Sequence, residues 1–401
     1  MERFDVLVVG AGPTGSAAAK ECVDGGLSVL QIDKRGLPRR KACSGIITNQ
    51  AQNYVLENFG PIPTESFGKP FASRGMAFYF PSAGPVFVDA DCYSLYVWRD
   101  RFDHFLALAS GSDLRDETRL VSLAPERGKV RAVVSRNGKS HPVEAGYVVG
   151  ADGAFSATVR HIAPEVHKSV HWMTAVQKYY EGSIDADERY LYWILARGLG
   201  PFPWLNIKDG QIIIGLASNH GEPWQGRFSA YLDWLRKNLG LSIKRELATE
   251  GCMANAMAAT NRFFPGRGRV LIAGDAMGLM HQGGEGISCG LASGGLAGQA
   301  ILESRETGKD ALALYKRLVR PEMVTSLDQF NPLRVRQSAT STTVRNKGWL
   351  KGLDKRRKAM AARDLATFVA GEFRVPGMLP AVAENVVRRT LTRDYRIRIF
   401  D

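Results

Sequence analysis

The chain has 401 residues, of which 45% are hydrophobic and 23% are charged, and its formal net charge is +13 at pH 7. Its length excludes a single small module and allows two domains, or one large domain with a smaller one inserted. The composition is typical of a globular protein, no apolar run is long enough to span a membrane, and the N-terminus runs into a predicted strand without room for a signal peptide, so we expect a cytoplasmic protein.

The first predicted unit is a strand, a tight turn and a helix at the N-terminus. An apolar run leads into a G-x-G-x-x-G pattern formed by Gly10, Gly12 and Gly15. Gly10 permits the turn, Gly12 lets a pyrophosphate approach the backbone, and Gly15 lets the helix pack closely on the strand. The next strand delivers Asp33, whose carboxylate can accept hydrogen bonds from ribose hydroxyls. The unit therefore predicts dinucleotide binding, with FAD or NAD favoured over NADP.

Short strands and one helix follow. Residues 76–80 and 85–89 look like two strands joined by a Gly-Pro turn, which indicates an excursion into a second, sheet-based domain. The helix-like residues 101–109 return the chain to the first domain. Three strand-like runs come next, as in the meander inserted in FAD-binding Rossmann folds: residues 119–123, 130–134 and 147–149.

Two later segments repeat the design of a strand that delivers an aspartate. One strand ends in Asp152 and the other in Asp275. Beyond the second, Gly286 and Ile287 open a helix rich in small residues, whose free N–H groups and positive dipole end favour negative charge on the pyrimidine side of a reduced flavin. Asp275 suits hydrogen bonding to ribose or ribityl hydroxyls. With the N-terminal unit, these segments predict one FAD site assembled from distant parts of the chain.

Between these two aspartates, residues 171–254 carry further short strands and form the expected main body of the second domain. Its aromatic residues could line an apolar pocket or simply fill the core. Residues 255–300 return to the first domain, and the remainder is mainly helical by its pattern. We expect this helical part to be interrupted at four prolines: Pro321, Pro332, Pro376 and Pro380.

The positive charge is concentrated near the C-terminus. From residue 301 onward there are 21 Lys and Arg against 11 Asp and Glu. The densest stretch, residues 347–358, mixes cations with Trp349 and two leucines, and it could lie on an anionic membrane surface or form a solvated helix face. We expect no nucleic-acid binding, because no recognised nucleic-acid fold accompanies the charge.

Taken in order over about residues 1–320, several motifs resemble the geranylgeranyl reductase family, within the wider p-hydroxybenzoate-hydroxylase-like superfamily of FAD-dependent oxidoreductases. They are the glycine pattern with Asp33, residues 99–103, residues 150–153, residues 274–276 and residues 284–287. The resemblance implies that Arg99 contacts the FAD and that Asp152 mainly holds a turn. The candidate cofactor-binding residues are Gly10, Gly12, Pro13, Gly15, Asp33, Lys34, Arg99, Asp275, Gly286 and Ile287.

Two further segments are similar to the reductase branch. Residues 41–47 look like that family's C-G-G or C-S-G loop, which lies over the flavin, and residues 202–208 look like its Y-x-W-x-F-P-K strand. Asn206 and Ile207 replace the family's Phe-Pro, and the loop from residue 278 to 284 is one residue shorter and lacks the usual proline. These departures leave the shape of the flavin pocket, and with it the substrate, open.

Three less regular residues are candidates for the chemistry. Cys43 follows three cations, residues 39–41, which would favour its thiolate, so it could donate a proton or contact the flavin, or it could fill a loop. His281 could relay a proton or make a structural hydrogen bond. Trp204 could shape the substrate pocket or belong to the core. The five cysteines are widely spaced without a C-x-x-C pair, so we expect reduced thiols and no metal site.

The predicted fold class is α/β, and α+β overall: an FAD-binding Rossmann-like domain, an inserted antiparallel-sheet substrate domain and a helical C-terminal region. The expected boundaries are residues 1–75, 98–170 and 255–320 for the FAD-binding domain, residues 76–97 and 171–254 for the substrate domain, and residues 321–401 for the basic C-terminal region.

We therefore expect an FAD-dependent oxidoreductase that reduces C=C bonds of an isoprenoid, geranylgeranyl-type substrate by hydride transfer from reduced FAD, with NAD(P)H or a ferredoxin as external electron donor. Two alternatives stay open: an FAD-dependent monooxygenase that hydroxylates an aromatic small molecule or peptide side chain, and a non-catalytic, flavin-binding, membrane-associated partner protein. The expected partners are a hydrophobic or aromatic substrate and an anionic membrane surface at the basic C-terminal region. The oligomeric state is unknown at this stage.

Overall fold

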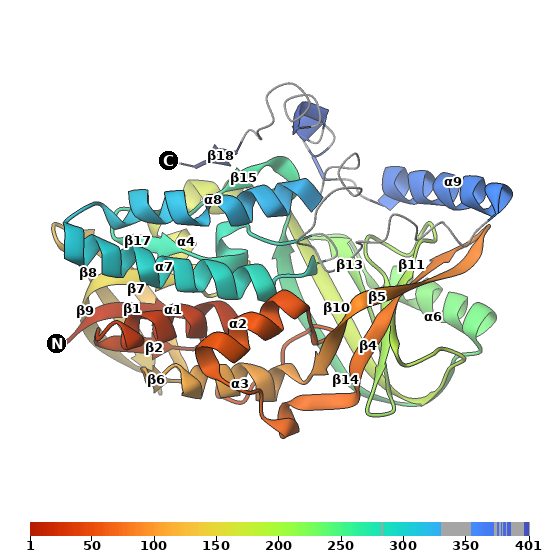
Figure 1. Ribbon diagram of the computed structural model, residues 1–401, viewed down its shortest axis with the longest axis horizontal. Coiled ribbons are helices and arrows are strands. Elements are labelled where there is room, and N and C mark those ends of the chain that lie inside the picture. The colour runs from red at the N-terminus through yellow and green to blue at the C-terminus, as the bar shows by residue number, and fades with distance from the viewer. Residues whose placement is uncertain are drawn as a thin grey trace.

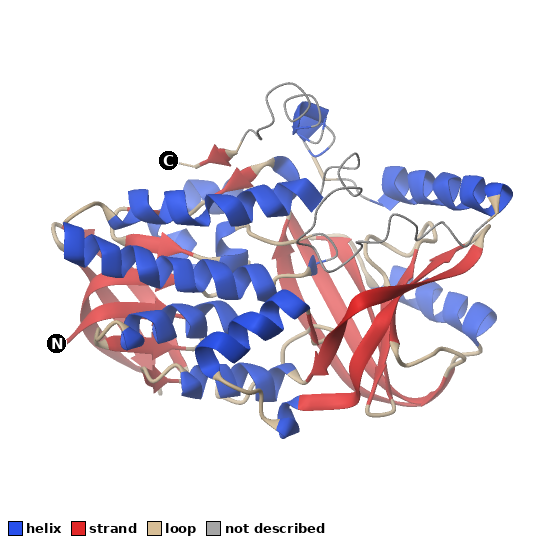
Figure 2. Ribbon diagram, viewed as in Figure 1, coloured by secondary structure: helices blue, strands red, loops and turns tan. Residues whose placement is uncertain are grey.

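Two eight-stranded sheets lie side by side and make up most of the fold (Figure 1). The computed structural model describes residues 1–281, 284–329 and 354–372, together with 375–376, 378, 380–381, 383–385 and 397–400. A layer of helices lies over one face of the first sheet, whereas the second sheet is built mainly of long strands (Figure 2).

The first sheet has a parallel centre. Its order is β16-β17-β9-β1-β2-β6, and the four neighbouring pairs from β17 to β6 run parallel. β1 ends in four buried residues and β2 is buried throughout, as expected for parallel strands covered on both faces. The meander β7–β8 continues the sheet by antiparallel pairing to β9. The strands are β1 (Glu2–Val9), β2 (Val29–Ile32), β6 (Asp113–Arg115), β7 (Thr118–Glu126), β8 (Lys129–Arg136), β9 (Lys139–Gly150), β16 (Gly266–Arg267) and β17 (Val270–Ile272).

Two helices of the covering layer, α1 and α7, pack against each other through small residues. A Cβ on Gly294 would lie 2.1 Å from the carbonyl oxygen of Thr14, and one on Gly290 would lie 2.5 Å from the hydroxyl of Thr14. Glycines four residues apart share one helix face, so the two backbones can approach closely. The helices of this domain are α1 (Pro13–Asp24), α2 (Asn49–Phe59), α3 (Arg99–Ala109), α4 (Ala157–Ile162), α5 (Pro164–Ser169), α7 (Ile287–Thr307) and α8 (Ala311–Gln329).

The second sheet has the order β14-β10-β13-β12-β11-β4-β5-β3. Its neighbours are antiparallel except β11 and β4, which pair in parallel. Helix α6 (Gln225–Leu239) buries Phe228, Tyr231 and Leu235 in the core of this sheet. The strands are β3 (Ile46–Ile47), β4 (Phe67–Phe80), β5 (Gly84–Val97), β10 (Trp172–Ser183), β11 (Tyr190–Ile194), β12 (Trp204–Lys208), β13 (Gln211–Asn219) and β14 (Ser242–Asn255).

The described C-terminal part adds helix α9 (Lys355–Glu372) and a small sheet of β15 (Arg262–Phe263) and β18 (Arg398–Ile399). α9 is bound to the tip of the β4–β5 hairpin, where Asp364 accepts hydrogen bonds from the backbone N–H and hydroxyl of Ser82 at 2.7 and 2.8 Å. Arg357 donates to the carbonyl of Ala83 at 2.8 Å. No helix among the described residues is both long and apolar enough to cross a bilayer. Short 3-10 turns lie at Thr64–Ser66, Ala258–Thr260 and Gly274–Met277.

The predicted fold class is confirmed: a Rossmann-like parallel sheet, a largely antiparallel second sheet, and helices toward the C-terminus. The domain boundaries stay a prediction, and the second sheet also takes in β3 and the part of β4 before residue 76. Residues 330–353, which include Pro332 and the first half of the basic stretch 347–358, lie outside the described residues.

The expected interruption at Pro321 is wrong, because α8 runs through it. A proline inside a helix removes one N–H hydrogen bond and costs about 3 kcal/mol. The same helix buries Tyr315, Val319, Met323 and Leu327 in the core of the first domain. Each such side chain contributes roughly 1.5–3 kcal/mol, so packing outweighs the local cost.

Candidate functional site

The carboxyl ends of four parallel strands meet at one edge of the first sheet. The strand registers place Val9 beside both Ile32 and Gly150, and Gly150 beside Ile272. The three segments that the sequence singled out begin directly after these strand ends. Topology therefore brings them to a single edge, which is where parallel sheets bind ligands.

The glycine turn at this edge is tightly packed. Gly10 has φ +114°, and a Cβ there would lie 2.4 Å from the carbonyl oxygen of Ala151. A Cβ on Gly15 would lie 1.9 Å from the carbonyl oxygen of Gly10. Gly12 is the N-cap of α1 and Pro13 is its first helical residue, and no side-chain hydrogen bond caps this helix start. The exposed N–H groups and the positive dipole end fit an anion such as a pyrophosphate.

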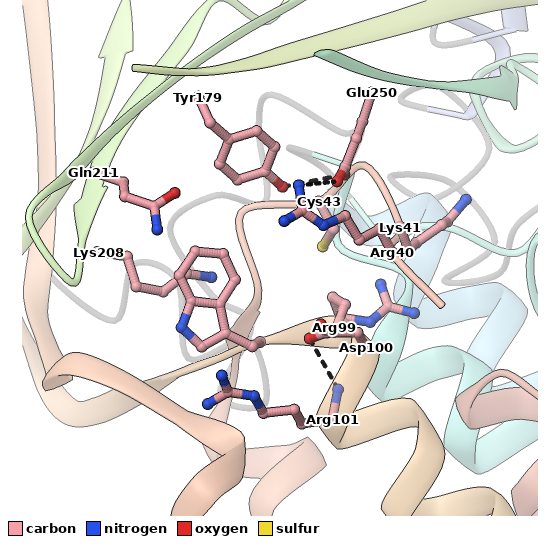
Figure 3. Close-up of a pocket in the computed structure, with 11 residues that line it drawn as sticks. Arg40, Lys41, Cys43, Arg99, Asp100, Arg101, Tyr179, Lys208, Gln211 and Glu250 are labelled. Carbon is pink, nitrogen blue, oxygen red and sulfur yellow. Dashed lines mark hydrogen bonds and ion pairs between the residues drawn. The ribbon is translucent and has the colours of Figure 1, made fainter. Parts of the chain in front are cut away.

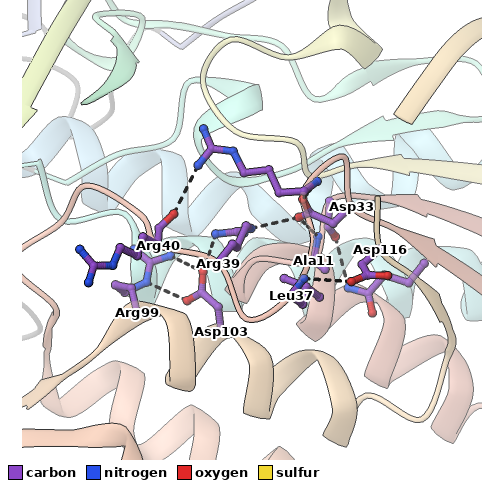
Figure 4. Close-up of polar contacts among 11 residues, drawn as sticks. Ala11, Asp33, Leu37, Arg39, Arg40, Arg99, Asp103 and Asp116 are labelled. Carbon is purple, nitrogen blue, oxygen red and sulfur yellow. Dashed lines mark hydrogen bonds and ion pairs between the residues drawn. The ribbon is translucent and has the colours of Figure 1, made fainter. Parts of the chain in front are cut away.

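A chain of charged side chains runs along the edge from Asp33 to Arg99 (Figure 4). Asp33 accepts a hydrogen bond from the backbone N–H of Ala11 at 3.0 Å and one from Arg39 at 3.3 Å. The other end of the Arg39 guanidinium binds Asp103 at 3.2 Å, and Arg99 binds the same carboxylate in a bidentate pair of 2.7 and 2.8 Å. Asp103 is fully buried, so its charge is balanced by these two arginines.

Asp275 lies half-buried at the start of α7. A Cβ on Gly286, the N-cap of this helix, would lie 2.7 Å from Asp275 Oδ1, so glycine is needed for the close approach. Ile287 is the buried first residue of the helix. Burial raises the pKa of Asp275, and the nearby cations Lys41 and Arg99 oppose this rise. The carboxylate thus stands beside the positive, N-terminal end of α7.

His281 is buried, with 5% of its surface exposed, behind the start of α7. Its Nδ1 lies 3.1 Å from Glu285 Oε2, and its Nε2 has no hydrogen-bond partner among the described residues. Glu285 also accepts from the backbone N–H of Ser288 at 2.8 Å and so caps the helix. Burial acts to raise the pKa of Glu285, but the hydrogen bonds from His281 and Ser288 outweigh it and the pKa is lowered. Cys289 brings a thiol into the same group, with one potential ligand atom of each of His281, Glu285 and Cys289 within 4.8 Å of the others.

A recess opens where the loop of residues 40–45 meets the second sheet (Figure 3). Cys43 lines it, and the Sγ atom of Cys43 accepts a hydrogen bond from the backbone N–H of Gly45 at 3.4 Å. Arg99 lies beside the thiol. Burial acts to lower the pKa of this arginine, but the neighbouring Asp103 and Cys43 outweigh it and the pKa is raised. Five cations line the recess against two carboxylates: Arg40, Lys41, Arg99, Arg101 and Lys208, with Asp100 and Glu250.

Trp204 is linked to this loop by one side chain. Its Nε1 donates to the side-chain oxygen of Gln177 at 3.2 Å, and the amide of Gln177 donates to the carbonyl of Cys43 at 3.3 Å and to the hydroxyl of Tyr179 at 2.6 Å. The Trp204 indole contacts Gly215, where an added Cβ would lie 2.1 Å from the ring, so glycine is needed for this close approach. The two segments that resemble the reductase family are therefore in contact.

The structure brings together most of the residues predicted for the site. Lys34 differs, because it is exposed. Asp152 accepts hydrogen bonds from the backbone N–H groups of Ala157 and Thr158 at 2.7 and 3.0 Å, and so holds the start of α4. Sequence reasoning missed Asp103 as a shared acceptor, although its spacing of four residues from Arg99 on a helix is a detectable signal. The role of each residue in binding or catalysis stays a prediction.

Comparison with known proteins places this geometry in context. The model of the FAD binding domain family matches residues 3–313. The digeranylgeranylglycerophospholipid reductase of Methanospirillum hungatei is 26% identical over 343 residues, covering 78% of this chain and 80% of that protein.

Two solved structures share the fold. A geranylgeranyl bacteriochlorophyll reductase-like protein from Thermoplasma acidophilum has a TM-score of 0.73 at 21% identity, covering 96% of this chain and 99% of the other. A flavin-dependent brominase has a TM-score of 0.66 at 16% identity, with coverage of 96% and 99%. At these identities the structural likeness establishes the fold and leaves the reaction open.

Proposed function

The chain belongs to the FAD binding domain family, and we propose that this FAD-dependent oxidoreductase reduces carbon–carbon double bonds of an isoprenoid, geranylgeranyl-type substrate. The observation that carries the proposal is the contact between the Cys43 loop and the Trp204 strand through Gln177. These are the two segments that resemble the reductase branch, and they meet beside the edge where FAD would bind. Relatives named as digeranylgeranylglycerophospholipid reductases support the same substrate class.

The residues at the sheet edge fit FAD. The glycine turn and the uncapped start of α1 would hold the pyrophosphate, and Asp33 would accept from the adenosine ribose. Asp275 would accept from the ribityl chain, and Gly286 and Ile287 would place the start of α7 at the pyrimidine side of the flavin. Reduced FAD supplies the hydride for the double bond.

Cys43 would supply the matching proton from its Sγ atom. The Gly45 N–H already points at this sulfur and Arg99 lies beside it, so the thiolate left after proton donation would be stabilised by a hydrogen bond and a positive charge. His281 is the second candidate, because its Nε2 has no partner among the described residues and could hold a proton there. The Trp204 ring would shape the wall against which the alkene lies.

The test is reoxidation of the bound flavin without oxygen. Purified FAD-loaded protein is reduced anaerobically and mixed under argon with geranylgeranyl lipids, and the saturated product is measured by mass spectrometry. We expect stoichiometric reoxidation by the wild type and strong loss in Cys43→Ser. Cys252→Ser is the matched control, because its half-buried thiol lies 3.9 Å from the carbonyl of Ala42 in the same loop. Reoxidation that occurs only after oxygen is admitted would contradict the reductase assignment.

A second candidate is a flavin monooxygenase acting on an aromatic small molecule or peptide side chain. It is favoured by the polar lining of the recess, in which five cations face two carboxylates and the aromatic rings of Trp98 and Tyr179. Such a recess suits an anionic aromatic better than a bare hydrocarbon. The same reduced protein, given candidate aromatics under oxygen, should then form a hydroxylated product, and isoprenoids should leave the flavin reduced under argon.

The external electron donor and the cellular partner extend this proposal. We propose NAD(P)H or a ferredoxin as the donor, to be separated by measuring which of them reduces the bound FAD. The basic C-terminal region would bring the protein to substrates held in a membrane, since the first turn of α9 carries Lys355, Arg356 and Lys358. Failure of the purified protein to sediment with anionic liposomes at low salt would overturn the membrane part alone.

A further inference from the structure

Lys208, at the end of strand β12, has a side chain that contacts three separate segments of the chain. It is 1% exposed, and its ammonium donates to the carbonyl oxygens of Ser44 at 3.0 Å and of Val97 at 2.9 Å. Ser44 belongs to the Cys43 loop, and Val97 ends β5 just before α3. The same ammonium lies 4.0 Å from the centre of the Trp98 ring, a cation–π contact. One buried charge thus ties the second sheet to the loop and to the start of α3.

The surroundings are shaped for an unbranched side chain. Gly45 has φ +70°, and a Cβ there would lie 2.8 Å from the Lys208 nitrogen and 2.1 Å from the Val97 carbonyl oxygen. A Cβ on Gly68 would lie 2.4 Å from Lys208 Cγ. The Trp98 ring is held in place by a hydrogen bond of its own, which its Nε1 donates to Asp209 at 2.6 Å. These close contacts therefore fit the unbranched side chain of a lysine.

We propose that Lys208 is a positioning residue, which holds the Cys43 loop in place over the flavin site through its buried side chain. The physical reason is that strand β12 contacts the loop through the hydrogen bond from the Lys208 ammonium to the Ser44 carbonyl, beside the backbone bond from the Val97 N–H to the Gly45 carbonyl that joins the loop to β5. Bonds from an ammonium to carbonyl oxygens are roughly twice as strong as those from a neutral amine, and a neutral amine makes no cation–π contact.

Several titratable or charged groups face this ammonium. Cys43 comes from the loop, Asp100 and Arg99 from α3, and Asp209 from the turn after β12, whereas β4 presents the uncharged Gly68. Burial is the largest influence and lowers the pKa of Lys208 to about 8, although Cys43, Asp209 and Asp100 act to raise it and Arg99 lowers it further. Because burial favours the neutral amine, loss of the charge in mildly alkaline solution stabilises this buried position and does not release the loop.

This inference rests on the proposed function only in placing the flavin under the loop, so its test needs no substrate. The FAD-loaded protein is followed at neutral pH by peptide-resolved hydrogen exchange over residues 42–47, corrected for intrinsic rates, with the bound-flavin absorbance spectrum as a second readout. We expect loop exchange to be at least about tenfold faster in Lys208→Met than in the wild type at neutral pH, because losing one charge-assisted bond already exceeds about 1.4 kcal/mol. Lys178→Met is the matched control, since Lys178 lies on strand β10 of the same sheet and pairs with Glu246 of β14.

The bound-flavin spectrum of Lys208→Met should shift from that of the wild type, whereas the spectrum of Lys178→Met should not. Equal loop protection in the wild type and in Lys208→Met would overturn the proposal, as would an unchanged flavin spectrum in Lys208→Met. If Lys208→Met does not fold, Lys208→Gln is measured in its place, because it keeps an unbranched side chain without the charge, and wild-type loop protection in Lys208→Gln overturns the proposal. A protein that passes this test but does not reduce isoprenoids would refute the proposed substrate and leave the role of Lys208 intact.

Discussion

Replacement of Asp103 by Asn is expected to destabilise the protein strongly, because it breaks a buried charge balance. The Asp103 side chain is 0% exposed and binds Arg99 at 2.7 and 2.8 Å and Arg39 at 3.2 Å. In the variant, Arg39 keeps Asp33, whereas Arg99, itself only 10% exposed, loses the carboxylate that binds it twice. Removing one partner of a buried pair costs about 3–5 kcal/mol, since the other charge stays desolvated.

The assay is equilibrium unfolding in urea at neutral pH with saturating FAD, comparing the free energy of unfolding of wild type and variant. Asp113→Asn is the control, because Asp113 is 44% exposed and pairs with Arg115 at the surface, where such a pair contributes about 1 kcal/mol or less. The double variant Arg99→Met/Asp103→Asn removes the unpaired charge and should regain most of the loss. A loss below about 1 kcal/mol in Asp103→Asn, or no recovery in the double variant, would refute this reasoning.

Three further predictions follow from the same geometry. Gly15→Ala should abolish FAD binding, because the added Cβ would lie 1.9 Å from the Gly10 carbonyl oxygen. The measurement is the flavin absorbance per protein after purification, and a normal flavin content would contradict this prediction. Burial lowers the pKa of Lys208 from 10.5 to about 8, so the unfolded state binds more protons than the folded state between these two values. The free energy of unfolding of the wild type, relative to that of Lys208→Met, should therefore rise by about 3 kcal/mol as pH increases through this range. Paired urea titrations in which this difference does not change with pH would show that the pKa is not lowered. Trp204→Phe keeps an aromatic ring but loses the 3.2 Å hydrogen bond to Gln177. Because such a bond contributes about 1 kcal/mol, turnover should fall several-fold while the FAD content stays unchanged. Unchanged turnover would mean that this bond does not position the loop.

The strand ends that meet at one edge of the first sheet could be predicted from the sequence alone. An apolar strand, a glycine turn and a helix are local features, and their meanings depend on backbone sterics and helix-end chemistry rather than on distant contacts. Strands that pair in parallel must bring their carboxyl ends to one edge, so Asp33 and Asp275 could be placed together although more than two hundred residues separate them. The same rules did not reach the second sheet, where β4 and β5 each run for 14 residues and the predicted strands were about five residues long.

Which charges are buried depends on the tertiary structure and could not be predicted from the sequence. Lysine is mostly exposed in proteins, so nothing in the sequence around Lys208 marks a side chain that is almost wholly buried among two carbonyls and an indole ring. Arg39 reaches Asp103 across 64 residues of chain, and Pro321 stays helical because its neighbours are packed in the core. Burial of a charge or a proline is settled by partners that are far apart in sequence, whereas a turn or a helix start is settled by its own few residues.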